Sequence, residues 1–347
     1  CPMEDKKDIR ALTKEQLRDF FVAQGDKAFR GNQVYEWLWS KGAHQFEDMT
    51  NIAKETRALL QTHFVINHIQ VDQMQRSTDG TVKNAVRLHD GLVVESVLIP
   101  TETRTTACVS SQVGCSLDCN FCATARLKRM RNLQPDEIYD QVVAIDRESR
   151  LYYNHPLSNI VFMGMGEPLM NYPNVMKAIE KITSEEGLGM SPKRITVSTS
   201  GIPKMIKKMA DDGVKFKLAV SLHSAIESTR NKIMPFTTNF PLTDLRESLE
   251  YWYKTTKSKV TYEYVVWRGI NDNREAVDAL VKFCKYVPCK VNLIEYNPID
   301  DGEFQQASEE AIQAYITALE RNDIVVKVRR SRGKDIDAAC GQLANKS

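Results

Sequence analysis

The sequence predicts an α/β protein: a partial (βα)6 barrel of the TIM type, preceded by a small helical domain and a short β-hairpin linker region. Apolar residues recur at helical spacing near the start of the chain, and alternating segments separated by Asp-Gly pairs follow them. From Thr105 onward, short strand-like runs alternate with helical segments about six times. This rhythm is typical of a parallel sheet with crossover helices.

The composition is that of an ordinary folded protein. The chain has 347 residues, of which 42% are hydrophobic and 27% are charged, so it can bury a large core. Since single cores stop growing at about 250 to 300 residues, one large domain and one small domain are expected. No apolar run approaches the roughly 18 residues of a membrane span, and no leader-like segment opens the chain. We therefore expect a cytoplasmic protein without membrane association.

Charge and cysteine content narrow the classes of function. The net charge is only +2, so a nucleic-acid partner would have to be met by local basic patches. Eight cysteines without a secretory leader point to metal-binding or catalytic thiols rather than to a disulfide framework. Cys1 stands where an initiator methionine is usual, which suggests a processed start.

Residues 1–66 predict the helical domain. Apolar positions recur at helical spacing over 12–24, 29–40 and 51–64, and Thr13 is suited to the N-cap of the first helix. An RNA-facing patch is one interpretation of a group of basic and aromatic residues there: Lys27, Arg30, Lys41, Trp37 and Trp39. Aromatic residues at helical spacing more often belong to a core, and we favour that interpretation.

Residues 67–103 predict β-hairpins that join this domain to the barrel. Alternating segments over 69–74, 82–88 and 92–99 are separated by Asp-Gly pairs, which are a strong hairpin signal. Glu95 lies in the last segment. By pattern alone, a strand glutamate is more often a solvated edge residue than a catalytic base.

Residues 104–330 predict the barrel. The expected strands are 106–110, 159–163, 195–199, 217–222, 260–266 and 291–295, with a possible edge strand at 325–328. The expected helices are 136–148, 175–183, 203–210, 242–253, 274–285 and 309–320. Barrel folds place their chemistry at the carboxyl ends of strands. Candidate residues fall there repeatedly: Cys115, Glu167, Ser198, Ser221, His223 and Asn297.

Three cysteines in one short loop carry the strongest chemical signal. Cys115, Cys119 and Cys122 are spaced by four and three residues, and structural zinc sites use four ligands. A cubane iron–sulfur cluster also takes four thiolates, so a cluster held by three leaves one iron open to a small molecule. The alternative is a zinc site completed by a distant residue such as Cys108 or a histidine.

The remaining cysteines differ in context. Cys284 and Cys289 lie on or just after an apolar helical face and are best interpreted as inert buried thiols. Cys108 ends the strand that feeds the cysteine loop, so its side chain should lie near that loop. Cys340 lies in a polar tail, residues 331–347, that is too short to form its own core.

The spacing of the three cysteines, with Phe121 beside the last one, resembles the signature of radical S-adenosylmethionine (SAM) enzymes. The likeness extends further, and the whole pattern closely resembles the RlmN/Cfr family of radical SAM RNA methyltransferases. The segments that carry this resemblance are 108–115, 131–133, 166–168, 198–201, 221–223, 292–294, 297–298 and 337–343. They span almost the whole chain.

The resemblance implies a radical SAM barrel that binds a [4Fe-4S] cluster through Cys115, Cys119 and Cys122, with SAM on the open iron. The SAM-contacting positions that it implies are Gly166, Glu167, Ser198, Ser221, Leu222, His223 and Asn297. Gly-Glu at 166–167 would then meet the SAM ammonium group, because glycines let backbone carbonyls approach closely and a cation needs acceptors.

The same resemblance implies a ping-pong methylation of an adenine ring carbon that uses two SAM molecules per turnover. Cys340 takes the methyl group, carries it to the adenine and is thereby tethered to RNA. Cys108 then attacks the sulfur of Cys340, releasing product and leaving a Cys108–Cys340 disulfide. Glu95 corresponds to the family's proton acceptor, which overrides the solvated-strand interpretation.

The target base must leave its surroundings to reach a buried site. Two basic runs flank the two cysteine-bearing segments and are predicted to bind phosphate: Arg126, Lys128, Arg129 and Arg131, and Lys327, Arg329, Arg330, Arg332 and Lys334. The implied partners are 23S rRNA, tRNA and an electron donor such as flavodoxin with its reductase, and a monomer is expected.

The family motifs leave the regiochemistry open. RlmN-type members methylate carbon 2 of adenosine in 23S rRNA and tRNA, whereas Cfr-type members methylate carbon 8 of the ribosomal adenosine and confer antibiotic resistance. The helical start and the segment 125–131 look closer to the RlmN type, so carbon 2 is preferred. A non-catalytic, zinc-stabilised RNA-binding protein is the alternative from another class.

Overall fold

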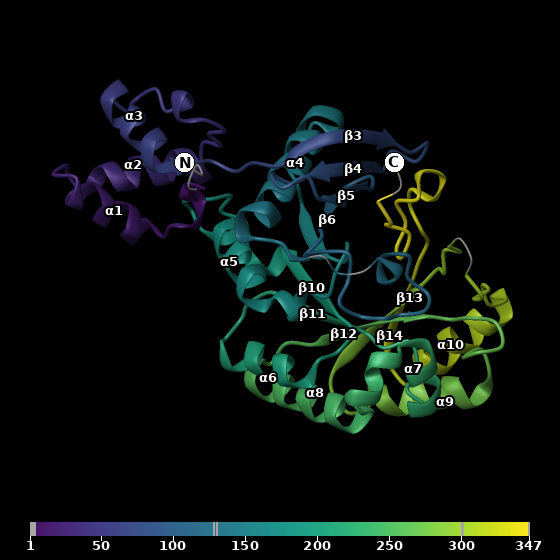
Figure 1. Ribbon diagram of the computed structural model, residues 1–347. Helices are drawn as coiled ribbons and strands as arrows, with labels where there is room; N and C mark the ends of the chain where they lie inside the picture. Colours follow the sequence, from purple (N-terminus) through teal and green to yellow (C-terminus); the bar gives the residue numbers. More distant parts are fainter. Residues whose placement is uncertain (1–4, 128, 130, 300–301, 346–347) are drawn as a thin grey trace.

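Ten strands form one open, mixed sheet that curves into a partial barrel (Figure 1). The computed structural model describes residues 5–127, 129, 131–299 and 302–345. Seven strands run parallel: β6 (Thr105–Cys108), β9 (Asn159–Phe162), β10 (Ile195–Thr199), β11 (Lys217–Ser221), β12 (Val260–Val265), β13 (Cys289–Ile294) and β14 (Val325–Arg329). Each predicted barrel strand is present.

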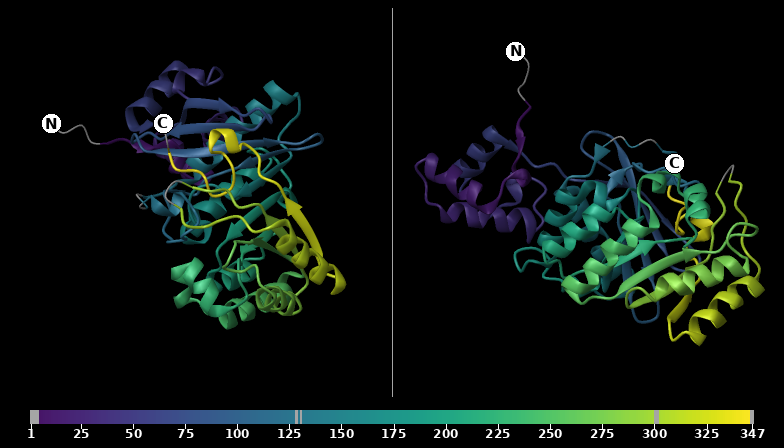
Figure 2. Two further views of the ribbon diagram at one scale, coloured as in Figure 1. Left: turned by 90° about the vertical axis from the view of Figure 1, so that its right-hand side faces the viewer. Right: turned by 90° about the horizontal axis from the view of Figure 1, so that it is seen from below.

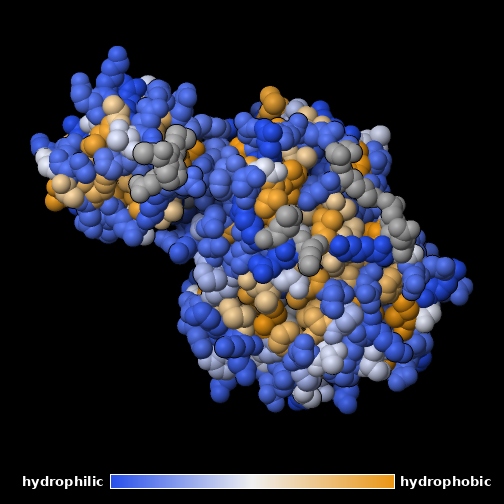
Figure 3. Space-filling model, in the orientation of Figure 1, coloured by the Kyte–Doolittle hydropathy of each residue, from blue (hydrophilic) through white to orange (hydrophobic). Residues whose placement is uncertain are grey.

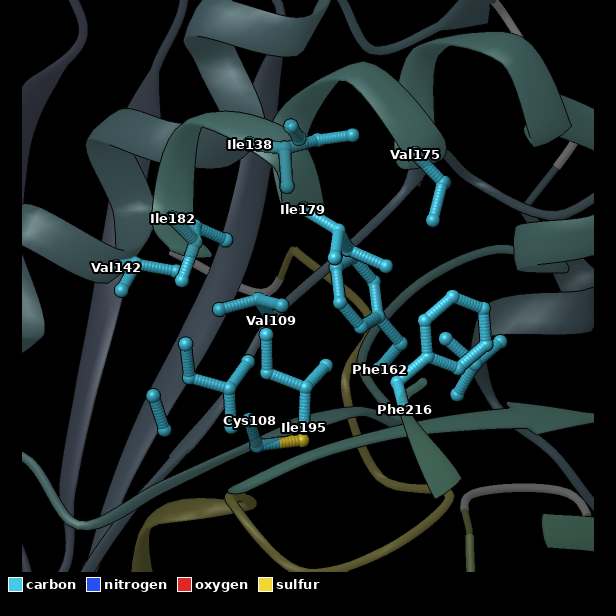
Figure 4. Close-up of a cluster of buried hydrophobic side chains, with 14 of the residues drawn as sticks. Cys108, Val109, Ile138, Val142, Phe162, Val175, Ile179, Ile182, Ile195 and Phe216 are labelled. Atoms are coloured by element: carbon cyan, nitrogen blue, oxygen red, sulfur yellow. The ribbon is translucent and has the colours of Figure 1, made fainter. Parts of the chain in front are cut away.

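Helices cover the outer face of the parallel strands (Figure 2). They are α4 (Pro135–Tyr153), α5 (Tyr172–Thr183), α6 (Pro203–Asp211), α7 (Glu227–Ile233), α8 (Leu242–Thr256), α9 (Arg274–Cys284) and α10 (Glu309–Arg321). All were predicted except α7. The core between helices and strands is apolar, and Figure 4 shows Ile138 and Val142 of α4 and Ile179 and Ile182 of α5 above Ile195 of β10.

The predicted hairpin region is part of the same sheet rather than a separate linker. β3 (Gln70–Arg76), β4 (Val82–Arg87) and β5 (Val93–Pro100) extend it antiparallel beyond β6. Val97 of β5 pairs with Cys108 of β6, and Ile160 of β9 pairs with Ala107 on the other side. The strand that carries Cys108 is therefore an interior strand, held by a ladder on both sides.

The N-terminal helices, α1 (Lys14–Ala23), α2 (Phe29–Trp39) and α3 (Lys54–His63), form a compact unit beside the barrel (Figure 1). Thr13 caps α1 as predicted, in a capping box with Gln16. Trp39 is 3% exposed, which confirms its place in the core. A buried, bidentate ion pair between Arg10 and Asp140 of α4, with a shortest N···O distance of 2.7 Å, ties this unit to the barrel.

The C-terminal tail, residues 331–345, bridges the gap between the two ends of the open sheet. After β14 it crosses to the β3–β4 turn, where the Gly333 amide donates to Asp79 Oδ2 at 2.8 Å. It then runs back to β5, where Asn345 Nδ2 donates to the Val93 carbonyl at 2.8 Å. Figure 2 shows the tail in yellow, lying across the barrel.

The surface in Figure 3 is largely hydrophilic, and hydrophobic residues gather toward the middle of the barrel face. Among the described helices, none combines the length and apolar character that crossing a membrane requires.

Candidate active site

The cluster loop, residues 114–127, follows β6 and the short strand β7 (Gln112–Val113) at the carboxyl end of the barrel. Gln112 organises it through a single side-chain oxygen. Gln112 Oε1 accepts hydrogen bonds from the Ser116 amide at 3.2 Å and hydroxyl at 2.8 Å, and from the Glu167 amide at 2.9 Å. One amide side chain thus joins the cysteine loop to the Gly-Glu-Pro segment after β9.

The three loop cysteines open onto one cavity of about 120 Å3. Its walls come from the cluster loop, from the ends of four parallel strands and from the tail. The polar and thiol side chains that line it are Cys115, Cys119, Cys122, Thr124, Glu167, Ser198, Thr199, Ser200, Ser221, Glu263 and Cys340. Seven of these residues, Cys115, Cys119, Cys122, Glu167, Ser198, Ser221 and Cys340, were predicted from the sequence to be functional, and they face the same space although they lie far apart in the chain.

Burial changes the pKa of two of the loop thiols. Burial raises the pKa of Cys115 to about 12 and raises that of Cys119 as well, with the neighbouring loop cysteines adding to the effect. Among the described residues, no three His, Cys, Asp or Glu side chains are placed to share one metal ion. A tetrahedral zinc needs four ligands on one ion.

The Gly-Glu segment shows why glycine is required. Gly166 has a φ of +100°, and a Cβ there would lie 2.6 Å from Gln112 Cβ and 2.7 Å from its backbone nitrogen. Glu167 is buried, and its carboxylate accepts from the Leu169 amide at 2.9 Å, the Thr199 hydroxyl at 2.9 Å and the Ser200 amide at 2.7 Å. The backbone lies close to the cavity wall and a fixed carboxylate faces the cavity.

These features fit the cofactors that the cysteine pattern implies. Three convergent thiols with no fourth in the same loop suit a cluster with one open iron. The close backbone approach at Gly166 and the carboxylate of Glu167 offer acceptors to an ammonium group.

The other predicted SAM-contacting residues divide into two groups. Ser198 and Ser221 line the cavity. Leu222, His223 and Asn297 lie behind its wall: Leu222 is buried, and His223 Nδ1 accepts from the Val265 amide at 3.0 Å. Burial, with the Arg230 charge adding, lowers the pKa of His223 to about 3, so the imidazole is neutral.

Asn297 contacts the tail rather than the cavity. Its Nδ2 donates to the Cys340 carbonyl at 3.2 Å, and its buried Oδ1 has no partner among the described residues. Two further bonds fix the same part of the tail: the Ala123 amide donates to the Gly341 carbonyl at 2.9 Å and the Thr124 hydroxyl to the Leu343 carbonyl at 2.6 Å. The cluster loop and strand β13 thus hold the chain around Cys340.

Cys340 lies between the cluster cavity and a second cavity of about 110 Å3. The second cavity is lined by Cys108 and Arg329 as well as by Cys340. Both thiols are free. Burial raises the pKa of Cys108 to about 12, with the Arg329 charge acting in the opposite direction. The two cysteines, 232 positions apart, therefore face a common space.

Glu95 is not a solvated edge residue, and the interpretation from pattern alone is wrong. It is 2% exposed, because β5 is an interior strand and the tail covers it. Glu95 Oε1 accepts from the amides of Ala344, at 3.0 Å, and Asn345, and Oε2 lies 3.1 Å from Lys83 Nζ. Since Val97 pairs with Cys108 and strand side chains alternate, Glu95 and Cys108 lie on the same face of the sheet.

Several residues of the two basic runs are paired within the protein. Arg131 contacts Asp90 and Glu137, both at 2.7 Å, Arg332 contacts Asp79 at 3.4 Å, and Lys334 contacts Glu295. These ion pairs stabilise the tail and the strand after the cluster loop. Because the charges are already paired, less positive charge is available to bind phosphate. Lys128 lies outside the described residues.

Three residues near the cavity were missed from the sequence: Gln112, Arg230 and Glu263. Arg230, 1% exposed, donates to the carbonyls of Leu222, Ser200 and Ser221 and so holds the ends of β10 and β11 together. Glu263 faces the cavity from β12. Alternation with Tyr262 and Tyr264 was the signal that would have placed Glu263 inside the barrel.

Comparison with known proteins agrees with this geometry. Residues 109–283 match the model of the radical SAM superfamily, and residues 7–66 match that of the ribosomal RNA large subunit methyltransferase N-terminal domain. A crystal structure of a radical SAM methyltransferase from Sphaerobacter thermophilus is similar at a TM-score of 0.91, with 36% identity over 98% of this chain and 100% of that chain. The fold is that of a radical SAM enzyme.

Sequence relatives narrow the class. A probable dual-specificity RNA methyltransferase RlmN from Flavobacterium johnsoniae is 85% identical over 99% of this chain and 98% of its own length. A dual-specificity RNA methyltransferase RlmN from Geotalea uraniireducens is 41% identical over 98% and 97%. The chain belongs to the RlmN family of radical SAM RNA methyltransferases. The cofactors of such enzymes are a [4Fe-4S] cluster and SAM, which confirms the cluster prediction over the zinc alternative.

Proposed function

We propose that the protein methylates carbon 2 of adenosine in 23S rRNA and tRNA, by a ping-pong reaction that passes the methyl group through Cys340 and consumes two SAM molecules. The observation that carries the proposal is the position of Cys340, which lines both the cluster cavity and the cavity of Cys108. A methyl-carrying thiol must meet the source of the methyl group, the radical that activates it and the thiol that releases the product.

Bound SAM supplies a methyl group and, when cleaved by one electron at the cluster, a 5′-deoxyadenosyl radical. The chain's own residues orient this chemistry. Glu167 and the backbone near Gly166 bind the amino-acid end, Ser198 and Ser221 bind from the neighbouring strand ends, and Leu222, His223 and Asn297 support them. Cys340, held by the cluster loop and Asn297, presents its sulfur to the same cavity.

Cys340 then carries the one-carbon unit to the adenine and is covalently joined to RNA. Glu95 takes the ring proton, for which it must first lose its bonds to the tail amides. Cys108 attacks the sulfur of Cys340: an S–S bond forms, the bond from that sulfur to the product carbon breaks, and the carbon takes the electron pair and a proton. The resulting disulfide is reduced before the next turnover.

The partners that we propose are 23S rRNA and tRNA in the cytoplasm, and an electron donor such as flavodoxin with its reductase, acting on a monomer. RNA would approach the exposed side of Cys340, and the target base would be splayed from its stack to reach it. Arg329 and Arg330, which line the second cavity, are the basic residues that we propose for contact with its phosphates.

The decisive experiment removes Cys108. The Cys108→Ala variant should accumulate RNA covalently attached to Cys340, because the releasing thiol is absent. After anaerobic expression, the adduct is detected by nuclease digestion and mass spectrometry of the peptide that contains Cys340. Cys289→Ala is a matched control, since that half-buried thiol bonds to Cys284 outside the site, and it should yield no adduct. Iron-loaded Cys108→Ala without any adduct would contradict the mechanism.

The carbon that is methylated is tested separately. Mass spectrometry of nucleosides from 23S rRNA and tRNA, in cells that lack or express the protein, should show 2-methyladenosine only with expression. Appearance of 8-methyladenosine in 23S rRNA alone would identify the protein as Cfr-type instead.

A further inference from the structure

Three buried carboxylates near the proposed catalytic cysteines differ in how their oxygens are occupied. Both oxygens of Glu95 have partners in the tail and at Lys83. The Glu167 carboxylate accepts three hydrogen bonds. Glu263 is 3% exposed, and its Oε1 has no hydrogen-bond partner among the described residues. A buried oxygen without a partner is costly, and this one is available to accept a proton.

The register of β12 directs Glu263 into the barrel. Its neighbours Tyr262 and Tyr264 point outward, to Phe283 of α9 and Tyr315 of α10. Glu263 pairs with Ser221 of β11 and Asn292 of β13, which places these three side chains on the inner face. Glu263 and Cys340 line the same cavity.

The groups that face Glu263 come from every neighbouring part of the site. Arg329 projects from β14, Ser198 from β10, Cys108 from β6 and Cys340 from the tail. Burial raises the pKa of Glu263 to about 7, against the opposing effects of the Arg329 charge and hydrogen bonding from Ser198. At neutral pH a large fraction of this carboxyl group is therefore ionised and can act as a base.

Cys340 needs such a base. Burial of the thiol, with the negative charge of Glu263 adding, raises the pKa of Cys340 to about 12, although the residue as a whole is exposed. The thiol therefore holds its proton at neutral pH. Only the thiolate is an effective nucleophile. Two carboxylates line the described part of the cluster cavity, and that of Glu167 already accepts three hydrogen bonds. Among the described residues that line the cavity of Cys108, none carries a carboxylate.

We propose that Glu263 accepts the proton that Cys340 gives up when its sulfur is methylated. The inference rests on the proposed function. In this step the Cys340 S–H bond breaks and its proton moves to Glu263 Oε1, while Cys340 Sγ forms a bond to the methyl carbon. The bond from that carbon to the SAM sulfonium breaks, and its electron pair stays on the departing sulfur, giving S-adenosylhomocysteine. No oxidant or reductant is required.

The test measures methylation of Cys340 directly, without RNA. Anaerobically reconstituted holoenzyme is mixed with SAM that carries a deuterated methyl group, and mass spectrometry of the Cys340 peptide follows label uptake between pH 6 and 9. In the wild type, the rate should rise with pH to a plateau, with an apparent pKa near 7. Glu263→Gln should be about 100-fold slower, and its rate should rise with pH without a plateau. Glu263→Asp, which keeps a carboxylate, should methylate Cys340 at least tenfold faster than Glu263→Gln.

Glu148→Gln is the matched control. Burial also raises the pKa of Glu148 to about 7, but this residue bonds to Asn84 outside both cavities. The control should methylate Cys340 at the wild-type rate and with the wild-type pH profile.

Equilibrium dialysis of SAM with each variant shows whether Glu263 acts as a base or only supports the structure of the SAM site. SAM affinity in Glu263→Gln should stay within threefold of wild type. A wild-type methylation rate in Glu263→Gln would overturn the inference. So would a slower rate that is fully explained by weaker SAM binding or by lower iron content. Absence of Cys340 methylation in the wild type would instead refute the proposed function.

Discussion

The cluster loop and the tail meet at one cavity but are held there by different forces. The cluster loop is fixed mainly by neutral groups: Gln112 accepts from Ser116, and the Asn120 side chain donates to the Lys232 carbonyl at 2.8 Å. Phe121 packs against His223, with ring centroids 4.8 Å apart. The tail also has neutral bonds around Cys340, but on either side of them it depends on carboxylates, at Asp79, Glu295 and Glu95.

This difference separates two tasks. A loop held by neutral bonds and aromatic contacts keeps its geometry when charges around it change, which suits a site that must hold a cluster. A tail whose two ends are held by charge-assisted bonds can be released by changes in charge at those carboxylates. This combination suits a fixed radical source and a detachable methyl carrier, which are the roles that we propose for the cluster and for Cys340.

The largest expected effect comes from the cluster loop. Cys119→Ser should abolish both cluster binding and methylation, since two thiolates remain where three are needed. Iron analysis and visible absorbance after anaerobic reconstitution measure the first, and methylation of RNA measures the second. Cys284→Ser, a buried thiol far from the cavity, should retain about four irons per chain and its activity. A Cys119→Ser enzyme with a full cluster would contradict the assignment of this loop.

Gly166→Ala tests how tightly the backbone at Gly166 packs against Gln112, which holds the cluster loop. The added Cβ would meet Gln112, so the substitution should cost about 1–3 kcal/mol of folding free energy and reduce iron content. Thermal unfolding and iron analysis measure both. Gly213→Ala is a control with a similar positive φ of +66° and no atom within 4 Å, and it should lose less stability and no iron. Equal effects of the two changes would show that backbone strain, not the contact with Gln112, matters.

Asp79→Asn tests the carboxylate contacts that hold the tail. The variant loses the carboxylate that accepts from Gly333 and pairs with Arg332, so RNA methylation should fall about tenfold, the loss expected when one charge-assisted bond worth about 1.4 kcal/mol is removed. Iron content should not change. Hydrogen exchange of residues 331–345 measures the release of the tail, and unchanged exchange would contradict the role of Asp79.

The smallest effect concerns pH. Against the opposing effect of burial, hydrogen bonds from Gly333 and Thr81 hold the pKa of Asp79 well below its usual value. A lowered pKa means that the contact is fully present above the ordinary value near 4 and is lost only as the pH falls toward the lowered one. Tail protection, corrected for intrinsic exchange, should be constant between pH 8 and 5. A loss of protection already at pH 6 would show that another group controls the tail.

The regular parts of the fold could be predicted because their signals are local. The predicted bounds of β10 match the observed strand, and α9 and α10 begin at the predicted residues. Helix α7 was missed, since its seven residues are mostly polar and lack an apolar repeat. Its tertiary contacts stabilise it, because Arg230 bonds to the ends of β10 and β11, and these contacts cannot be predicted from the local sequence.

The candidate site also combines residues with a local sequence signal and residues whose environment depends on distant parts of the chain. Spacing alone identified the three loop cysteines, and the resemblance supplied Cys108, Cys340 and Glu95. Burial of Glu95 could not be predicted from its strand, because the groups that cover it, Ala344 and Asn345, lie about 250 positions later. The same holds for Gln112, whose role depends on Ser116 and Glu167 meeting at one oxygen.

The short distance along the chain from β14 to Cys340 limits what release of the tail can do. Cys340 follows Arg329, the last residue of β14, by 11 positions. A flexible segment of that length has a root-mean-square span of about 18 Å, which corresponds to an effective concentration in the millimolar range at its anchor. A detached Cys340 therefore stays at a high local concentration near Cys108 and the cluster cavity. Docking of the tail governs the direction in which the sulfur points, and the tether already ensures that it returns.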